Sequence, residues 1–462
     1  MLNDKYVRMR LQTVLAEGLA HQSYYLSDHD EAMVIDPRRD CAIYTKMAAS
    51  ECAKITYIFE THCHEDFVTG SLALQNQTGA EVGHSKETRF QYGDHALADG
   101  DRFAVGDLRI DVLSTPGHTK DSVSFVVYEK RESEVPLVVF TGDTLLAGDV
   151  GRTDLLGSDF TRAQAKKLHS SIFATLLPLG DQPGVYPAHG PGSLCGNKMR
   201  VRAHSTMGYE RQLNPLLQLD EDEFVRRLST QQLSLPPYFR RAQRLNVQGP
   251  PPAPQRLREI DSDEFQGLAR DAATVIDTRE AGAFAGSHIP GSLSIWLDGV
   301  SVYPGWILSD EARVALVTER PVDAVLAQTY LHRLGLDTVT AHLCSGIREW
   351  RNRGKPIARI KTCSVDELKK AVDRAACSVL DVREEDEWRE GHIKGAQHVF
   401  VGHLPQQITK VPRDLPLAVH CSWGGRASLA ASILARHGFT RVYNVLGAMR
   451  AWKSRGYPLE RG

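Results

Sequence analysis

Four short segments place histidine or aspartate directly after predicted strands. Their candidate ligands, in chain order, are His62, His64, Asp66, His118, Asp143 and His189. Neutral imidazole and ionised carboxylate are the groups that a borderline divalent metal prefers, and loops at strand ends can bring them into one pocket. One such histidine alone is more often a surface or hydrogen-bonded core residue. The ordered set of four segments predicts a metal site.

A second reactive group is predicted near the C-terminus. Cys421 stands in the run Leu417–Arg426, where an apolar strand ends and a helix begins. Backbone N–H groups of a short loop and a helix N-terminus stabilise a thiolate, and a thiolate can attack sulfur and carry it as a persulfide. We therefore predict a sulfur-transferring nucleophile. The expected binding residues around it are Ser422, Trp423, Gly424, Gly425 and Arg426.

The elements that position Cys421 belong to a repeated sequence. Val275–Ser292 recurs as Val379–Ala396, and Gly346–Ile357 recurs as Gly447–Leu459. Each copy alternates short apolar runs with helical stretches, the pattern of a parallel α/β domain. The sequence predicts two tandem domains, over 256–358 and 359–462.

The first copy lacks the nucleophile. Thr318–Asp323 stands where Cys421–Arg426 stands in the second copy, and Asp323 places an acid in the anion site. Cys344 lies well beyond this loop and cannot replace the missing cysteine. We expect the first copy to be inactive and to serve as a structural or docking module.

The segment before the repeats has a different pattern. Apolar runs such as 32–35, 55–59 and 110–113 are bounded by turns, which predicts a sheet-rich domain over 1–248 with helices outside. The proline cluster that follows favours an extended linker over 249–255. The expected fold class is therefore a mixed α/β and α+β chain of three domains.

The order of the histidine and aspartate motifs resembles the metallo-β-lactamase superfamily, which implies an αββα sandwich. The motifs are HxHxD, PGH, GD and PAHG. In the usual hydrolytic pattern a histidine follows the aspartate of the first motif and helps to hold a second metal. Phe67 occupies that position here, and a phenyl ring has no lone pair to donate. We therefore expect one metal.

One branch of this superfamily, the persulfide (sulfur) dioxygenases, uses a single iron. Its further signatures resemble Gly151–Asp154 and Leu213–Pro215, so the resemblance covers roughly residues 10–240. It implies one Fe(II) per chain, with zinc as the alternative in purified protein, and open positions on the iron for a persulfide sulfur and O₂. Residue by residue, it implies the ligands His62, His118 and Asp143, surrounded by His64, Asp66 and His189.

Three further residues near these motifs have two interpretations each. Arg152 is a candidate for binding an oxyanion of the thiol carrier, the alternative being a structural salt bridge. Cys195 lies in a glycine-rich segment that resembles one in fused dioxygenases, which implies a persulfide relay near the iron; the alternative is an inert thiol. Cys63, between two pocket histidines, is expected to be a packing residue.

The two repeats resemble rhodanese domains. The second copy has the CxxGxR loop that begins at Cys421, with DVR and GHIxGA upstream of it. The first copy has this frame without the cysteine. The resemblance implies one active and one inactive rhodanese domain after the dioxygenase.

Composition excludes several classes of partner. Lys+Arg 55 against Asp+Glu 57 gives a net charge of -2, so the chain as a whole has no electrostatic attraction to nucleic acid or to an anionic membrane. We find no secretory signal and no apolar run of about 18 residues. The 8 cysteines form no CxxC pair, which argues against a disulfide scaffold. We expect a cytoplasmic protein with free thiols; whether it forms a homo-oligomer is open.

The leading hypothesis is a bifunctional enzyme of hydrogen sulfide detoxification. The iron site would oxidise the persulfide of glutathione or another low-molecular-weight thiol with O₂ to sulfite. Cys421 would transfer sulfane sulfur and so form or use thiosulfate. The fusion raises the effective concentration of one product at the other site, but the direction of sulfur flow and the thiol stay open. The alternatives are a zinc thioester hydrolase like glyoxalase II with accessory rhodaneses, and a non-catalytic persulfide carrier or sensor.

Overall fold

The computed structural model describes residues 9–129, 134–196, 199–231, 234–252 and 256–461. By contacts the chain divides into two compact units, one of Met1–Ala253 with Arg333–Gly335 and one of Pro254–His332 with Leu336–Gly462. Of the expected linker over 249–255, residues 253–255 lie outside the described residues. Among the described helices, none has the length and apolar character needed to cross a membrane.

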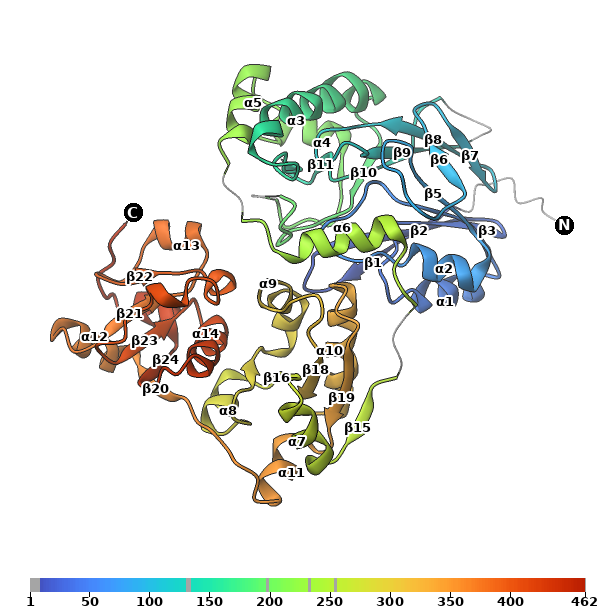
Figure 1. Ribbon diagram of the computed structural model, residues 1–462. Helices are drawn as coiled ribbons and strands as arrows, with labels where there is room; N and C mark the ends of the chain where they lie inside the picture. Colours follow the sequence, from blue (N-terminus) through green and yellow to red (C-terminus); the bar gives the residue numbers. More distant parts are fainter. Residues whose placement is uncertain (1–8, 130–133, 197–198, 232–233, 253–255, 462) are drawn as a thin grey trace. The chain divides into compact units, whose positions relative to one another are not determined.

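The first unit contains two six-stranded sheets, ordered β1-β2-β3-β4-β5-β6 and β14-β13-β10-β9-β8-β7 (Figure 1). The first sheet consists of β1 (Arg10–Ala16), β2 (His21–Asp28), β3 (Glu31–Ile35), β4 (Lys54–Phe59), β5 (Glu81–Ser85) and β6 (His95–Leu97). The second consists of β7 (Arg102–Val105), β8 (Leu108–Ser114), β9 (Val123–Glu129), β10 (Val138–Gly142), β13 (Gly184–Pro187) and β14 (Ser205–Thr206). A short hairpin of β11 (Leu145–Leu146) and β12 (Asp149–Val150) follows β10.

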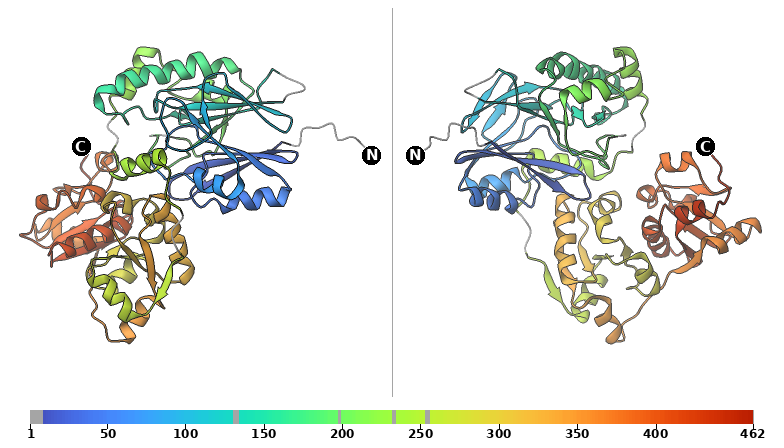
Figure 2. Two further views of the ribbon diagram at one scale, coloured as in Figure 1. Left: turned by 45° about the vertical axis from the view of Figure 1, so that its right-hand side comes forward. Right: turned by 180° about the vertical axis from the view of Figure 1, so that it is seen from behind.

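Successive side chains of these strands point alternately toward the other sheet and toward the covering helices. Tyr24 and Leu26 of β2 join a core with Phe125 and Phe140 of the second sheet, whereas Tyr25 faces the helix layer. The helices are α1 (Ala42–Glu51), α2 (Ser71–Thr78), α3 (Ser158–Ser170), α4 (Met207–Leu213), α5 (Glu221–Ser229) and α6 (Tyr238–Gln248). Helices α1 and α2 cover the first sheet and α3 and α5 the second, so the unit is an αββα sandwich (Figure 2). This confirms the predicted fold of the first domain.

The second unit contains two five-stranded parallel sheets with the same strand order. They read β15-β19-β18-β16-β17 and β20-β24-β23-β21-β22, so the repeat seen in the sequence is a repeat of topology. The first consists of β15 (Arg258–Ile260), β16 (Thr274–Asp277), β17 (Leu293–Ser294), β18 (Val314–Val317) and β19 (Val339–Leu343). The second consists of β20 (Lys361–Ser364), β21 (Ser378–Asp381), β22 (Gln397–His398), β23 (Leu417–His420) and β24 (Val442–Leu446).

Helices connect the parallel strands, as crossover connections require. The first repeat has α7 (Ser262–Arg270), α8 (Ala281–Gly286), α9 (Tyr303–Ile307), α10 (Pro321–Arg333) and α11 (Gly346–Asn352). The second has α12 (Val365–Asp373), α13 (Glu385–Glu390), α14 (Gly425–Arg436) and α15 (Ala448–Ser454). Each repeat has its own apolar core, centred on Trp350 in the first and on Trp452 in the second.

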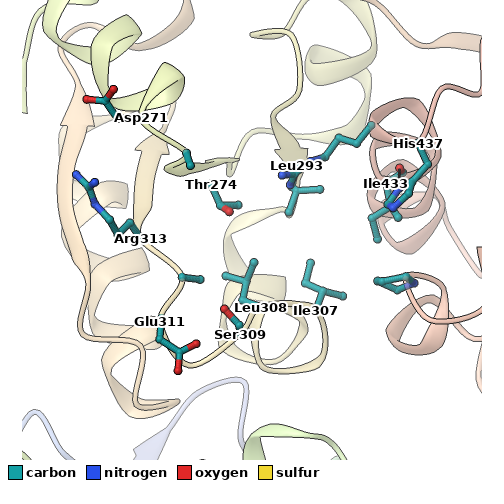
Figure 3. Close-up of a pocket in the computed structure, with 14 residues that line it drawn as sticks. Asp271, Thr274, Leu293, Ile307, Leu308, Ser309, Glu311, Arg313, Ile433 and His437 are labelled. Atoms are coloured by element: carbon teal, nitrogen blue, oxygen red, sulfur yellow. Dashed lines mark hydrogen bonds between the residues drawn. The ribbon is translucent and has the colours of Figure 1, made fainter.

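A groove of about 780 Å³ runs between the two repeats. Figure 3 shows Ile307 and Leu308 of the first repeat beside Ile433 and His437 of the second. Because Ile433 and His437 stand at the C-terminal end of α14, this groove is at the opposite end of that helix from Cys421. It is therefore separate from the predicted sulfur-transfer site.

Candidate metal centre and sulfur-transfer site

The predicted metal ligands come from loops at the ends of strands in both sheets. His62 follows β4 of the first sheet, His118 lies between β8 and β9, and Asp143 follows β10. The structure brings all three side chains together, fully buried. His62 Nε2 lies 3.9 Å and His118 Nε2 3.4 Å from the same oxygen, Asp143 Oδ2.

Hydrogen bonds fix which ring nitrogen of each histidine faces the centre. Thr61 Oγ1 donates to the acceptor-only carboxylate of Asp36 at 2.8 Å, so it accepts from His62 Nδ1 at 2.9 Å. The Nδ1–H of His118 donates to the backbone carbonyl of Arg152 at 2.9 Å. Both Nε2 lone pairs therefore face Asp143, and both are buried without a hydrogen-bond partner among the described residues.

The electrostatics suit a ligand set of two neutral imidazoles and one carboxylate. Burial, the largest cause, lowers the pKa of His62 and of His118, which keeps both rings neutral. Burial would raise the pKa of Asp143, but the charge and the hydrogen bond of His189 hold it well below its usual range. Two orphaned imidazole nitrogens beside an ionised carboxylate are the donors that a divalent metal needs.

His189, Asp66 and His64 lie directly behind these three residues. His189 Nδ1 is 2.8 Å from Asp143 Oδ2, and its Nε2 is 2.9 Å from Asp66 Oδ2. Burial would lower the pKa of His189, but Asp143 and Asp66 raise it well above its ordinary value, so the ring bridges two carboxylates as a cation. His64 Nε2 lies 3.0 Å from Asp36 Oδ1.

Phe67 packs where a further metal-binding histidine would stand. Its buried ring has its centroid 4.5 Å from that of His64 and 3.9 Å from that of His21. His21, at the start of β2, did not figure in the sequence analysis. It is buried, and neither ring nitrogen has a hydrogen-bond partner in the part of the chain described. No motif marks it, because only the pairing of β2 beside His189 brings it to the site.

Glu65 is a second residue that the sequence analysis missed, although it stands inside the first motif. Its carboxylate lies within 4.8 Å of nitrogen atoms of His62 and His118, so a second carboxylate faces the two histidines. Burial, with the charges of Asp121 and Asp66, raises its pKa well above the usual range. The sequence feature that could have identified Glu65 is its position between His64 and Asp66, two candidate ligands of the first motif.

Arg152 is occupied by protein partners. Its guanidinium binds Asp154 through two hydrogen bonds of 2.6 and 2.8 Å and donates to the carbonyls of Leu194 and Ser234 at 3.2 and 3.3 Å. Its own carbonyl accepts from His118. This geometry is that of the structural salt bridge, with a second role in orienting His118; binding of a thiol carrier stays a prediction.

Cys195 reaches the same centre from the loop after β13. Its Sγ lies within 4.8 Å of ligand atoms of His118 and Asp143, and also of Asp66 and His189. Burial and the charge of Asp66 raise the pKa of this thiol, so it is protonated in the free protein. Cys63, by contrast, packs away from the centre, with its Sγ 3.9 Å from the carbonyl of Gln243. All 8 cysteines are free thiols.

Cys421 stands at the C-terminal end of β23, immediately before α14. Its side chain is fully buried, and the backbone N–H of Gly424 donates to its Sγ at 3.0 Å. Gly424 has a φ of 128°, a backbone conformation that glycine adopts without strain. This turn directs the N–H toward the sulfur, as the sequence analysis expected of the loop.

Glu387 of α13 organises the rest of this loop. It accepts two hydrogen bonds from Arg426, at 2.6 and 2.9 Å, and a further one from the hydroxyl of Ser422. Burial would raise the pKa of Glu387, but Arg426 and Ser422 lower it to about 2. No local motif marks Glu387, because it stands far from the loop along the chain. Arg426 is thus bound to a carboxylate of the protein.

The corresponding loop of the first repeat follows β18. Here Arg320 and Asp323 form an ion pair of 2.6 Å, and no cysteine stands in the loop. Cys344 follows β19, a different strand, and its backbone N–H bonds to Ile260. The first repeat therefore has the frame of the second without its cysteine.

Comparisons with known proteins match this division of the chain. Residues 16–189 match the model of the metallo-beta-lactamase superfamily, and residues 261–353 and 364–455 match that of the rhodanese-like domain. The mouse mitochondrial persulfide dioxygenase ETHE1 is 31% identical over 237 residues, which are 50% of this chain and 85% of that protein.

Two further similarities help to place the chain. A hydroxyacylglutathione hydrolase from Rhizobium johnstonii is 38% identical over 138 residues, 29% of this chain and 48% of that protein. A crystal structure of a metallo-beta-lactamase from Staphylococcus aureus aligns with a TM-score of 0.65 at 28% identity, covering 73% of this chain and 99% of that chain.

Proposed function

The chain belongs to the ETHE1 persulfide dioxygenase family and carries two rhodanese-like domains behind its metallo-β-lactamase fold, and we propose that it both oxidises a persulfide and transfers sulfane sulfur. One observation carries the proposal. Two buried imidazole nitrogens, which have no hydrogen-bond partner within the described residues, face one ionised carboxylate, at His62, His118 and Asp143. This donor set is the one that mononuclear iron oxygenases use.

Those three residues would hold one Fe(II), which would supply the activation of O₂ and the binding of the persulfide sulfur. The chain's own residues prepare the ligands. Thr61 keeps the proton of His62 on Nδ1, and His189 orients Asp143 through its ring N–H. Phe67 occupies the place of a ligand to a second ion, which favours a single metal.

The proposed oxidation balances without a further reductant. One thiol persulfide, one O₂ and one water give one thiol and one sulfurous acid, which ionises to sulfite. The outer sulfur loses four electrons, the two oxygen atoms of O₂ gain them, and the S–S bond breaks. Glutathione or another low-molecular-weight thiol would carry the sulfur, and the cytoplasm is the compartment that we propose for it.

The second reaction takes place at Cys421. Its thiolate accepts a sulfane sulfur, and the Gly424 N–H that bonds to Sγ stabilises the negative charge there. Sulfite that attacks the outer sulfur of this persulfide leaves as thiosulfate, and the Cys421 thiolate returns. The reverse reaction would load Cys421 from thiosulfate. Cys195, whose Sγ lies within 4.8 Å of ligand atoms of His118 and Asp143, would serve as a relay that presents sulfur to the iron.

The test is an oxygen-electrode assay of iron-loaded protein with glutathione persulfide and coenzyme A persulfide, in which sulfite and thiosulfate are quantified. We expect one O₂ consumed for each sulfite equivalent formed. The similarity to hydroxyacylglutathione hydrolases makes a zinc thioesterase the alternative. About two zinc per chain, thioester hydrolysis and no oxygen uptake would establish that alternative instead.

A further inference from the structure

The repeat without a nucleophile supplies aromatic side chains to the loop of Cys421. The ring of Trp296 lies 5.2 Å from that of Trp423, in the Cys421 loop, and 5.1 Å from that of Tyr303 at the start of α9. A β-carbon added to Gly425 would lie 2.9 Å from Trp296 Cε3, so the first repeat touches the first turn of α14.

Polar contacts hold this segment of the first repeat in place. The hydroxyls of Ser294 and Ser428 are 2.7 Å apart, and the backbone N–H of Ser294 donates to Ser432 Oγ at 3.1 Å. Ser428 and Ser432 are buried on α14, the helix that begins beside Cys421. The segment from β17 to α9 is therefore fixed against the sulfur-transfer loop by both apolar and polar contacts.

Tyr303 presents an unused hydroxyl at this place. Its side chain is half-buried, and within the described residues its hydroxyl makes no hydrogen bond. Burial, the largest cause, raises the pKa of Tyr303, and the charges of Arg426, Glu384 and Cys421 also act on it. The phenol is thus a neutral O–H donor, and its ring packs against Trp296, the residue that contacts the loop at Trp423.

The Cys421 loop has few uncommitted hydrogen-bond donors for the oxygens of an anionic substrate. Arg426, the cation of the loop, is bound bidentately by Glu387 and also donates to Ser422 at 2.9 Å. This pairing offsets its charge and uses three of its five N–H donors. A sulfonate group that approached the sulfur would therefore bind more tightly with a further donor, and among the described residues the hydroxyl of Tyr303 is the one that the first repeat provides.

We propose that Tyr303 is a specificity residue of the Cys421 site, which donates a hydrogen bond to a sulfonate oxygen of thiosulfate or to an oxygen of sulfite. This inference rests on the proposed sulfur transfer at Cys421. When thiosulfate loads the enzyme, Cys421 thiolate attacks the outer sulfur, the Sγ–S bond forms, and sulfite leaves with the electron pair of the old S–S bond. Tyr303 holds the sulfite oxygens in both directions and exchanges no proton.

The test compares two sulfur donors that load the same cysteine. Tyr303→Phe keeps the ring that packs on Trp296 but removes the hydroxyl. Loss of a hydrogen bond to a charged group costs about 10- to 100-fold in equilibrium or rate, so thiosulfate:cyanide kcat/KM should fall by that factor, chiefly through KM for thiosulfate. With glutathione persulfide as donor, which has no sulfonate at the reacting sulfur, turnover to cyanide should be unchanged.

One control variant and one further measurement distinguish this role from a structural one. Tyr457→Phe removes a hydroxyl that bonds Asp366 elsewhere in the second repeat, and it should leave both donors unaffected. Inhibition of persulfide:cyanide turnover by sulfite provides a second measurement, and Tyr303→Phe should weaken it by the same factor.

An equal loss of kcat/KM with both donors would contradict the role of Tyr303, because a purely structural residue would affect both reactions equally. An unchanged kcat/KM with thiosulfate would contradict it as well. Failure of the proposed function looks different. In that case the wild-type protein itself would transfer no sulfur from either donor, and Cys421→Ser would change nothing.

Discussion

At the scale of single residues, proton positions decide whether the centre can bind a metal. His62 presents its Nε2 lone pair because Thr61 Oγ1 accepts the Nδ1 proton, and Thr61 in turn donates to Asp36. Thr61→Val keeps the shape of the side chain and removes this acceptor. Removing such a supporting partner typically costs 10- to 100-fold in metal affinity, so we expect a loss of about that size.

Iron affinity measured in competition with a chelator checks this prediction. Thr45→Val is the matched control, because among the described residues the hydroxyl of Thr45 on α1 bonds only to the carbonyl of Ala42. Unchanged iron affinity in Thr61→Val would show that the ring of His62 is oriented by packing alone.

Glu384 makes the stability of the second repeat depend on pH. Burial, and the charges of Glu387 and Asp386, raise its pKa to about 7 despite the opposing charge of Arg426. A carboxyl whose folded pKa is raised binds its proton more tightly in the folded state. Its stabilising contribution is therefore complete below the unfolded value of 4.5 and is lost as the pH rises toward 7.

Glu384→Gln should therefore flatten the dependence of Tm on pH between the unfolded pKa of 4.5 and the folded pKa of about 7. The variant should gain stability relative to the wild type as the pH rises to 7. Calorimetry over this pH range checks it, and Glu385→Gln, on an exposed neighbour, is the control. Parallel Tm curves for wild type and Glu384→Gln would contradict the assignment.

At the scale of elements, the glycines that flank helix α14 set the backbone conformation at its two ends, and the first of them contacts Cys421 Sγ. Gly424 before the helix has a φ of 128° and Gly438 after it a φ of 81°, and a β-carbon would meet no atom at either site. Alanine at either glycine should thus lower stability through backbone strain alone, by about 1 kcal/mol. Only Gly424→Ala should also lower sulfurtransferase kcat/KM, because the Gly424 N–H bonds to Cys421 Sγ.

Unfolding midpoints and steady-state turnover of the two variants separate these effects. Equal turnover in both variants would mean that the conformation at Gly424 does not direct its N–H to the sulfur.

Many elements were predictable because their apolar periodicity is local. The predicted runs 55–59 and 110–113 correspond to β4 (Lys54–Phe59) and β8 (Leu108–Ser114). The pattern of residues 427–437 predicts a helix, and the structure has α14 (Gly425–Arg436) there. The pattern of residues 162–176 predicts one helix, but α3 ends at Ser170 and a wider π-helical turn, Ser171–Leu176, continues it. Its boundaries depend on packing against α5 and the second sheet, which periodicity does not contain.

At the scale of the whole molecule, the residues proposed for the two reactions belong to separate compact units. Cys421→Ser should therefore abolish sulfur transfer and leave most persulfide-dependent O₂ consumption. His118→Ala, which removes a proposed metal ligand, should abolish O₂ consumption and leave sulfur transfer. Oxygen-electrode and thiosulfate:cyanide assays on both variants test this, and loss of both activities in either variant would contradict independence of the sites.

The sequence by itself determined which residue types could bind metal or carry sulfur, and it showed that two domains repeat. Motif order and strand-end positions suffice for this, because both are properties of contiguous segments. Only the tertiary structure decided what surrounds those residues. His21, Glu387 and Tyr303 reach the sites from segments distant in the chain, through strand pairing and packing between repeats. Such neighbours depend on how sheets and helices pack together, and no local pattern encodes that.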